Sequence, residues 1–122
     1  MDNKQLVTRF YDEVFNAHDT SHIDEFMRDD YIQHNAHVAD GKAGFLEFAK
    51  FFLAMEPRAE MISMTAEGDL VCVFFKCTMM KTGAVNKVFD LYRIEGGMLA
   101  EHWDCVEHDV TDDGAANANG LF

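Results

Sequence analysis

Apolar residues first recur at helical spacing near the N-terminus, at Leu6, Val7, Phe10, Tyr11, Val14 and Phe15. Recurrence every three or four positions is typical of a helix with one buried face. Asp2 or Asn3 is suited to cap this helix, because a short polar side chain can accept a free backbone N–H at its start. The pattern therefore predicts a first helix packed along one side.

Two more helices are predicted before Pro57, the only proline. Thr20 or Ser21 can cap a short helix of about two turns with an apolar face at Ile23, Phe26 and Met27. Residues 31–37 show no helical period. Asp40 and Gly41 then form a turn before a third helix, whose apolar positions are Phe45, Leu46, Phe48, Ala49, Phe52 and Leu53.

From Arg58 onward the hydrophobic period becomes two, which is typical of strands. Turn residues follow at regular intervals, at Gly68-Asp69, Thr82-Gly83 and Gly96-Gly97. We expect four antiparallel strands near residues 60–66, 70–80, 86–94 and 98–106, forming a meander that curls around the helices. The fold class is α+β, with one domain over residues 1–110. A polar tail over residues 111–122 should be mobile except where Leu121 and Phe122 dock.

The amino-acid composition limits the kinds of molecule that the chain is expected to bind. The chain of 122 residues is 48% hydrophobic and carries a formal charge of −12, which disfavours nucleic acid and anionic membranes. The apolar stretches are too short to span a bilayer, and the N-terminus lacks the features of a secretory signal. Three cysteines without CxxC spacing are expected to be reduced thiols. A soluble, cytoplasmic protein is expected.

Candidate chemistry lies in the last predicted strand, in the segment MLAEHWD that ends at Asp104. His102 and Asp104 are two residues apart, so they point to the same face of a strand. In a closed apolar pocket, an imidazole and a carboxylate can have pKa values suited to proton transfer. The alternative for Asp104 is a carboxylate at a strand end that accepts backbone hydrogen bonds.

Asp90 interrupts an apolar run in the third predicted strand, and its neighbours on the same face are apolar. It therefore lies on a solvated face or, as we favour, in a cavity. If the Gly96-Gly97 turn is a plain two-residue hairpin, Asp90 opposes Trp103. With one extra residue it opposes Asp104, and Tyr92 opposes His102. Only the second register gathers Asp90, His102 and Asp104 on one face.

Two histidines between the helices complete the candidates. His34 is either a hydrogen-bonded structural residue or part of a site at the mouth of the sheet. With His37 it forms an HxxH pair, but a metal site would have to borrow a third ligand from His102 or Asp104. We therefore expect no metal.

The opposite face of the sheet is predicted to be an interaction surface. Trp103 and Glu101 are expected there together with Leu99. In the register with the extra residue, Trp103 joins Leu91 and Phe89 in an apolar patch outside the pocket, and such patches often mark interfaces. We therefore expect a homodimer through the sheet.

Several segments together resemble the SnoaL-like polyketide cyclase group of the nuclear transport factor 2-like superfamily. They are FYDEVFN in the first helix, YIQHN at residues 31–35 and the ending D-x-YRIEGG-x-x-x-EHWD. The resemblance runs from about Leu6 to Val106. The last residues, NANGLF, are similar to the tails of a bacterial subgroup labelled as predicted aldol-condensation enzymes.

This resemblance implies a cone with one deep, mostly apolar pocket, commonly in a dimer. In the cyclases the aspartate matching Asp104 is the acid and base of an intramolecular aldol closure, without metal or cofactor. They place a histidine fourteen residues earlier, where this chain has Asp90.

We therefore expect an enzyme without a cofactor, a lyase or isomerase type that removes a proton next to the carbonyl of a small apolar molecule. Asp104 would be the base and His102 would orient or share the proton, while His34 and Asp90 would polarise or position the carbonyl. The expected pocket lining includes Tyr31, Asn35, Phe52 and Tyr92. The alternatives are a ligand-binding protein without catalysis and a dimerisation domain.

Overall fold

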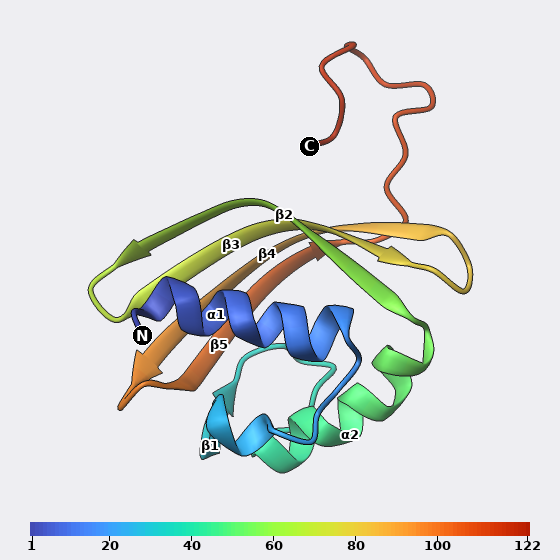
Figure 1. Ribbon diagram of the computed structural model, residues 1–122. Helices are drawn as coiled ribbons and strands as arrows, with labels where there is room; N and C mark the ends of the chain where they lie inside the picture. The colour runs from blue at the N-terminus through green and yellow to red at the C-terminus, as the bar shows by residue number, and fades with distance from the viewer.

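The computed structural model describes all 122 residues and shows a curved five-stranded sheet with the helices on its concave side (Figure 1). The helices are α1 (Asn3–Phe10), the π-helix η1 (Tyr11–Asn16), the 3₁₀ turn η2 (Ile23–Glu25) and α2 (Gly41–Ala54). The strands are β1 (Met27–Gln33), β2 (Pro57–Glu67), β3 (Leu70–Met79), β4 (Ala84–Glu95) and β5 (Met98–Glu107). The predicted α+β class is confirmed.

The sheet has the order β1-β5-β4-β3-β2, in which β2 to β5 form an antiparallel meander and β1 runs parallel to β5. The four predicted strands and their turns are confirmed. The expected two-turn helix is wrong, because only Ile23–Glu25 is helical and Met27 already begins a strand. In β1 only Met27 and Tyr31 are buried. A half-exposed edge strand of this kind shows no clear alternation.

The first helix is longer than α1 alone because a π-helix continues it. Asp2 Oδ1 accepts the backbone N–H of Gln5 at 2.8 Å, and the Gln5 side chain accepts the N–H of Asp2 at 2.9 Å, which confirms the predicted cap. In η1 the N–H of Ala17 reaches back five residues to the carbonyl of Asp12. The buried residues of the two segments are Leu6, Val7, Phe10, Tyr11, Val14 and Phe15, as the apolar pattern predicts.

Helix α2 lies below α1 in Figure 1. Its Phe45 belongs to the core, and Phe48 and Phe52 pack against it. The spacing of three and four residues places these rings on one face, whereas Phe51 is exposed. Gly44 allows the preceding loop to approach α2 closely, because a Cβ there would lie 1.9 Å from the carbonyl oxygen of Ala39. This contact helps to position the loop between β1 and α2, which contributes to the site.

A bulge near the start of β5 decides the register of the last hairpin. Ile94 pairs with Leu99 and Arg93 pairs with Glu101, so Ala100 is the extra residue. Asp90 consequently opposes Asp104 and Tyr92 opposes His102, as the second predicted register requires. The expectation for Leu99 is wrong: it lies in the core with no exposed surface, because the extra residue reverses the alternation of the strand.

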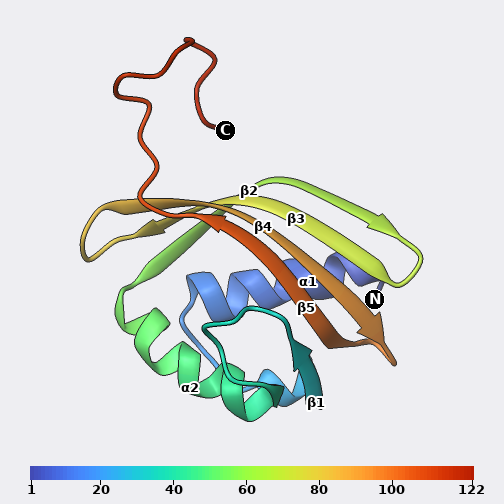
Figure 2. The same ribbon diagram turned by 180° about the vertical axis from the view of Figure 1, so that it is seen from behind.

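Beyond β5 the chain forms no helix or strand, and it leaves the sheet on the side away from the helices (Figure 2). Phe122 lies against Phe74, with ring centroids 6.0 Å apart, so the predicted contact of the chain end is present. None of the helices has both the length and the apolar character needed to cross a membrane.

Candidate active site

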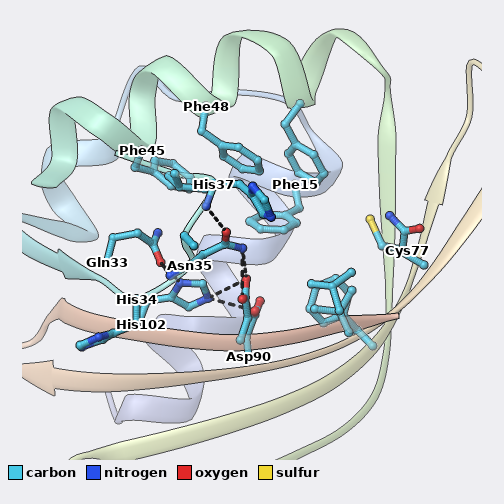
Figure 3. Close-up of a pocket in the computed structure, with 18 of the residues that line it drawn as sticks. Phe15, Gln33, His34, Asn35, His37, Phe45, Phe48, Cys77, Asp90 and His102 are labelled. Carbon is cyan, nitrogen blue, oxygen red and sulfur yellow. Dashed lines mark hydrogen bonds and ion pairs between the residues drawn. The ribbon is translucent and has the colours of Figure 1, made fainter. Parts of the chain in front are cut away.

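A cavity of about 690 Å³ lies between the concave face of the sheet and the helices (Figure 3). Its lining is mostly apolar, from Phe15, Phe45, Phe48, Phe52, Phe75, Cys77, Met79, Val88 and Val106. Polar side chains gather at one wall, from Gln33, Asn35, Asp90, Tyr92, His102 and Asp104. The exposed residues His37 and His108 also line the cavity, so it reaches the surface beside them. Such a pocket suits a small apolar molecule with a polar end.

Asp90, His102 and Asp104 meet at the polar wall. The Nε2 atom of His102 lies 3.0 Å from Oδ1 of Asp90 and 3.8 Å from Oδ2 of Asp104. The residues Asp90 and His102 are only 4% and 7% exposed. These three residues are the ones that the sequence predicted to share a face, and the bulge at Ala100 brings them together.

Asn35 is the hydrogen-bond partner of Asp104. The Oδ1 atom of Asn35 accepts the N–H of His37 at 2.9 Å, which leaves its Nδ2 group to donate. That group lies 3.1 and 2.9 Å from the two carboxyl oxygens of Asp104. Asp104 thus accepts from Asn35 at both of its oxygens. Its partner is a side chain, unlike the backbone contacts of the structural alternative.

Gln33 reveals the orientation of His102 in the same way. Its Oε1 atom accepts the N–H of Asn35 at 3.0 Å. The Nδ1 atom of His102 lies 2.7 Å from this oxygen and must therefore donate to it. The other ring nitrogen, Nε2, faces Asp90 and the cavity. One proton is consequently shared between Asp90 and Nε2 of His102.

Two tyrosines hold the far side of Asp90. The Tyr11 hydroxyl donates to Oδ2 of Asp90, and the Tyr92 hydroxyl lies 3.3 Å from that oxygen and 2.8 Å from the Tyr11 hydroxyl. Burial, together with the nearby Asp90 charge, raises the pKa of both phenols well above 10.0. Both tyrosines therefore remain neutral hydrogen-bond donors at neutral pH.

Burial dominates the electrostatics elsewhere in the pocket. It raises the pKa of Tyr31 well above 10.0, with a further contribution from Asp90 and Asp104. It also raises the pKa of Cys77 from 9.0 to about 12, so this thiol stays protonated and is no nucleophile. The chemistry of the cavity is confined to the polar wall.

The structure does not place the ring of His34 with the other three candidate catalytic residues. Its Nε2 atom lies 2.7 Å from Glu101, and its ring stacks on Trp103 with centroids 4.8 Å apart. Both partners belong to the outer face of the sheet. His34 is among the residues that line the cavity, but its ring is directed away from the polar wall (Figure 3). The ring has the hydrogen-bonded structural arrangement that was one of its two interpretations. Tyr31, Asn35, Phe52 and Tyr92 all line the cavity as expected.

The polar wall also has the composition of a metal site, since ligand atoms of Asp90, His102 and Asp104 lie within 4.8 Å of one another. However, Nε2 of His102 and the carboxyl oxygens of both aspartates are already hydrogen-bonded to protein groups. The HxxH pair does not converge either, because the His34 ring lies outside.

The outer face of the sheet carries an apolar patch, which we define as Phe74, Phe89, Leu91 and Trp103. Phe89 is 45% exposed, and its ring stacks on that of Phe74 with centroids 4.4 Å apart. Salt bridges border the patch, among them Arg93 with Glu101 at 3.0 Å. The predicted location of Phe89, Leu91 and Trp103 outside the pocket is confirmed.

Sequence reasoning missed two residues of the site. The sequence presents Tyr11 only as part of an apolar stripe, and Gln33 as part of the segment 31–37, which shows no helical period. A phenol among phenylalanines and valines is the available signal for Tyr11, because a buried hydroxyl needs a hydrogen-bond partner. No comparable signal exists for Gln33, whose role depends on the missed strand β1.

The family model for the SnoaL-like domain matches residues 7–102. The chain belongs to the SnoaL-like domain family. This SnoaL-like protein has no match among curated proteins. The family assignment agrees with the segments FYDEVFN and YIQHN that first indicated it.

Solved structures confirm the fold of this SnoaL-like protein. It is similar to IdmH, a proposed polyketide cyclase from Streptomyces antibioticus, with 22% identity, coverage of 88% of this chain and 93% of that one, and a TM-score of 0.72. It is also similar to AclR from Streptomyces galilaeus, a proposed hydroxylase, with 21% identity and a TM-score of 0.71. The similarity covers 85% of this chain and 87% of that one.

The chain is also similar to an NTF2-like protein of unknown function from Cytophaga hutchinsonii, with 15% identity and a TM-score of 0.71. The similarity covers 88% of this chain and 91% of that one. The nuclear transport factor 2-like fold is therefore shared by proteins whose names indicate different activities. The function has to be argued from the site.

Proposed function

We propose that this SnoaL-like protein is an enzyme that moves a proton next to the carbonyl group of a small apolar molecule without a cofactor. The observation that supports it is the pairing of the Asp104 carboxylate with the His102 ring, 3.8 Å apart at the polar wall of an apolar cavity. A base and a proton donor at this separation can contact neighbouring atoms of one substrate.

The proposed reaction is an enolisation. Asp104 takes the proton from the carbon next to the carbonyl, and the electron pair of that C–H bond moves so that negative charge develops on the carbonyl oxygen. The N–H at Nε2 of His102, which faces Oδ1 of Asp90 in the free protein, is then shared with this oxygen and stabilises it by a hydrogen bond. The proton then returns from Asp104 to carbon. Alternatively, the enolate carbon attacks a second carbonyl of the same molecule, the π bond of that carbonyl opens, and its oxygen takes the proton from Asp104 to complete the aldol closure.

The other residues have supporting parts in this proposal. Asn35 orients Asp104 through its two hydrogen bonds, and Gln33 orients His102. Asp90 acts through His102 and does not polarise the carbonyl directly. No part is assigned to the His34 ring, which lies on the other face of the sheet.

The charge of the site favours a neutral substrate. Two carboxyl groups lie at the polar wall, and the whole chain has a formal charge of −12. An anionic substrate would be repelled, most strongly inside a cavity of low dielectric constant. The apolar lining favours a molecule with a hydrocarbon body and one or two carbonyl groups.

Exchange of carbon-bound hydrogen for deuterium tests this function without knowledge of the natural substrate. A panel of small neutral ketones and aldehydes is incubated with the protein in deuterated buffer, and NMR follows loss of the proton next to the carbonyl. The protein should accelerate exchange for some members. Asp104→Asn should lower that acceleration at least about 100-fold, the low end for general base catalysis.

Asp112→Asn is the matched control, because it makes the same change in the exposed C-terminal segment. The proposal is wrong if Asp104→Asn keeps exchange within about tenfold of the unmodified protein. Saturable binding of a panel member without any exchange would instead indicate a ligand-binding protein.

We also propose that the protein forms a homodimer through the outer face of the sheet. The apolar patch supports this proposal, because four large apolar side chains gather there on neighbouring strands. A second copy would remove them from water.

A further inference from the structure

Tyr11 is buried at the start of the π-helix η1, and its hydroxyl is directed at the polar wall of the cavity. It has only 2% of its surface exposed, and its hydroxyl contacts Asp90 and Tyr92. A π-helix is uncommon and is often found at functional sites. Here it keeps Tyr11 and Phe15 on the interior side, so that the phenol of Tyr11 reaches across to β4.

The two oxygens of Asp90 have different partners. Oδ2 is contacted by the hydroxyls of Tyr11 and Tyr92, whereas Oδ1 lies 3.0 Å from Nε2 of His102. Hydroxyl donors bind a carboxylate more strongly than a neutral carboxylic acid, because the bond is assisted by charge. The tyrosine pair therefore favours the ionised form of Asp90, which leaves the shared proton on His102.

We infer that Tyr11, assisted by Tyr92, is a positioning residue that keeps the shared proton on His102 by stabilising the Asp90 carboxylate. It acts through Asp90 and does not touch the substrate. This inference rests on the proposed function for its catalytic consequence, since a protonated His102 is the group that stabilises the developing negative charge.

No cation other than His102 shares this task. The titratable groups that face Asp90 come from every element packed around it: Tyr11 from η1, Tyr31 from β1, Cys77 from β3, Tyr92 from β4, and His102 and Asp104 from β5. All except His102 are neutral donors or carboxyl groups. Hydroxyl donation is consequently the one available means, apart from His102 itself, of stabilising charge on Asp90.

Nitrogen-15 NMR of the histidine rings tests this inference directly on the full-length protein without ligand at neutral pH. In the unmodified protein both ring nitrogens of His102 should give the signals of a protonated ring. In Tyr11→Phe the Nε2 signal should move toward that of an unprotonated nitrogen, because loss of a hydrogen bond to a charged group shifts the proton balance about tenfold to a hundredfold. The deuterium exchange rate should fall about tenfold.

Tyr31→Phe is the matched control. It removes another buried hydroxyl from the same cavity, but Tyr31 makes no hydrogen bond to Asp90. Tyr92→Phe should change the Nε2 signal in the same direction as Tyr11→Phe, and it serves as the second variant if Tyr11→Phe does not fold.

The possible outcomes separate this inference from the proposed function. An unchanged Nε2 signal in both tyrosine variants, or an equal change in Tyr31→Phe, would overturn the inference whatever the catalytic activity. A changed signal in a protein that catalyses no exchange would leave the role of Tyr11 in place and reject the proposed function.

Discussion

Phe89 and Asp90 are neighbours in β4 and point to opposite faces of the sheet. The apolar residue faces outward and the charged residue faces inward, which is the reverse of the usual arrangement. Asp90 lies inside, 4% exposed, whereas Phe89 lies outside with 45% of its surface exposed. A sheet with one solvated face usually has apolar residues inside and polar residues outside. Both residues depart from the arrangement that favours stability of the isolated chain.

The difference between the two faces indicates their separate uses. Inside, a buried carboxylate is stable only because Tyr11, Tyr92 and His102 satisfy its oxygens. Outside, the apolar patch is covered within the chain only in part, by Phe122 near Phe74 and by His34 stacked on Trp103. The inner face thus suits the proposed proton transfer, and the outer face suits the proposed contact with a second copy.

The largest expected effect is produced by insertion of one alanine between Glu101 and His102. If Glu101 keeps its pairing with Arg93, the inserted residue shifts the rest of β5 by one position, and His102 and Asp104 would turn to the outer face. The insertion should unfold the protein or greatly lower its urea midpoint, as measured by circular dichroism. Insertion of one alanine after Asn117 in the exposed C-terminal segment should have little effect. An unchanged urea midpoint with the insertion in β5 would show that the register of β5 does not hold the two faces apart.

Asp90→Ala should be the next most damaging change. It leaves His102 and two tyrosine hydroxyls without their acceptor inside the protein, and loss of one member of a buried pair costs about 3–5 kcal/mol. Urea denaturation measures the free energy of unfolding, with Asp112→Ala as the exposed control. A loss below about 1 kcal/mol would mean that the inner network contributes little to stability.

Phe89→Asp should change assembly more than folding. The side chain is half exposed, so the free energy of unfolding of the monomer should fall by no more than about 1 kcal/mol, mostly from its contact with Phe74. A charge in the apolar patch should convert a dimer to a monomer in sedimentation equilibrium. If the unmodified protein is itself a monomer at micromolar concentration, the outer face is not a dimer interface.

The smallest effect is expected for Glu101→Gln on the outer face. The hydrogen bond with His34, and then that with Arg93, lowers the pKa of Glu101 below its usual 4.5. A lowered pKa in the folded state means that Glu101 stabilises the protein above pH 4.5 and that this contribution is lost as the pH falls further.

The urea midpoint of Glu101→Gln should therefore lie slightly below that of the unmodified protein at pH 7, and the difference should narrow in acid. Exposed ion pairs are weak, so the difference at pH 7 should be small. A difference that widens as the pH falls would contradict this assignment.

Local patterns predicted most of the fold. The helical stripe around Phe10, the cap at Asp2 and the glycine turns of the meander act over a few residues, so they are readable in one sequence. Strand β1 escaped prediction because it is an edge strand that pairs with β5, far away in the chain. Its pairing supplies the order that the segment itself does not encode locally.

The candidate site could be predicted only in part, because some of its residues are placed by local strand geometry and others by contacts between distant segments. His102 and Asp104 are two residues apart, so their common face follows from strand geometry alone. Asp90 could be assigned to that face only in one of two registers. The position of the His34 ring depended on a contact with Trp103 and Glu101, which no local pattern reveals.

The sequence by itself determined the α+β order, the family and the types of side chain available for proton transfer. Tertiary structure decided which of these side chains meet: the bulge at Ala100 aligned Asp90 with Asp104, and packing of η1 brought Tyr11 to Asp90. Periodicity and capping depend on neighbouring residues, whereas the pairing of charged and polar groups depends on strands and helices that are distant in the chain. For that reason the chemistry of the pocket appears only once the sheet has curved around its helices.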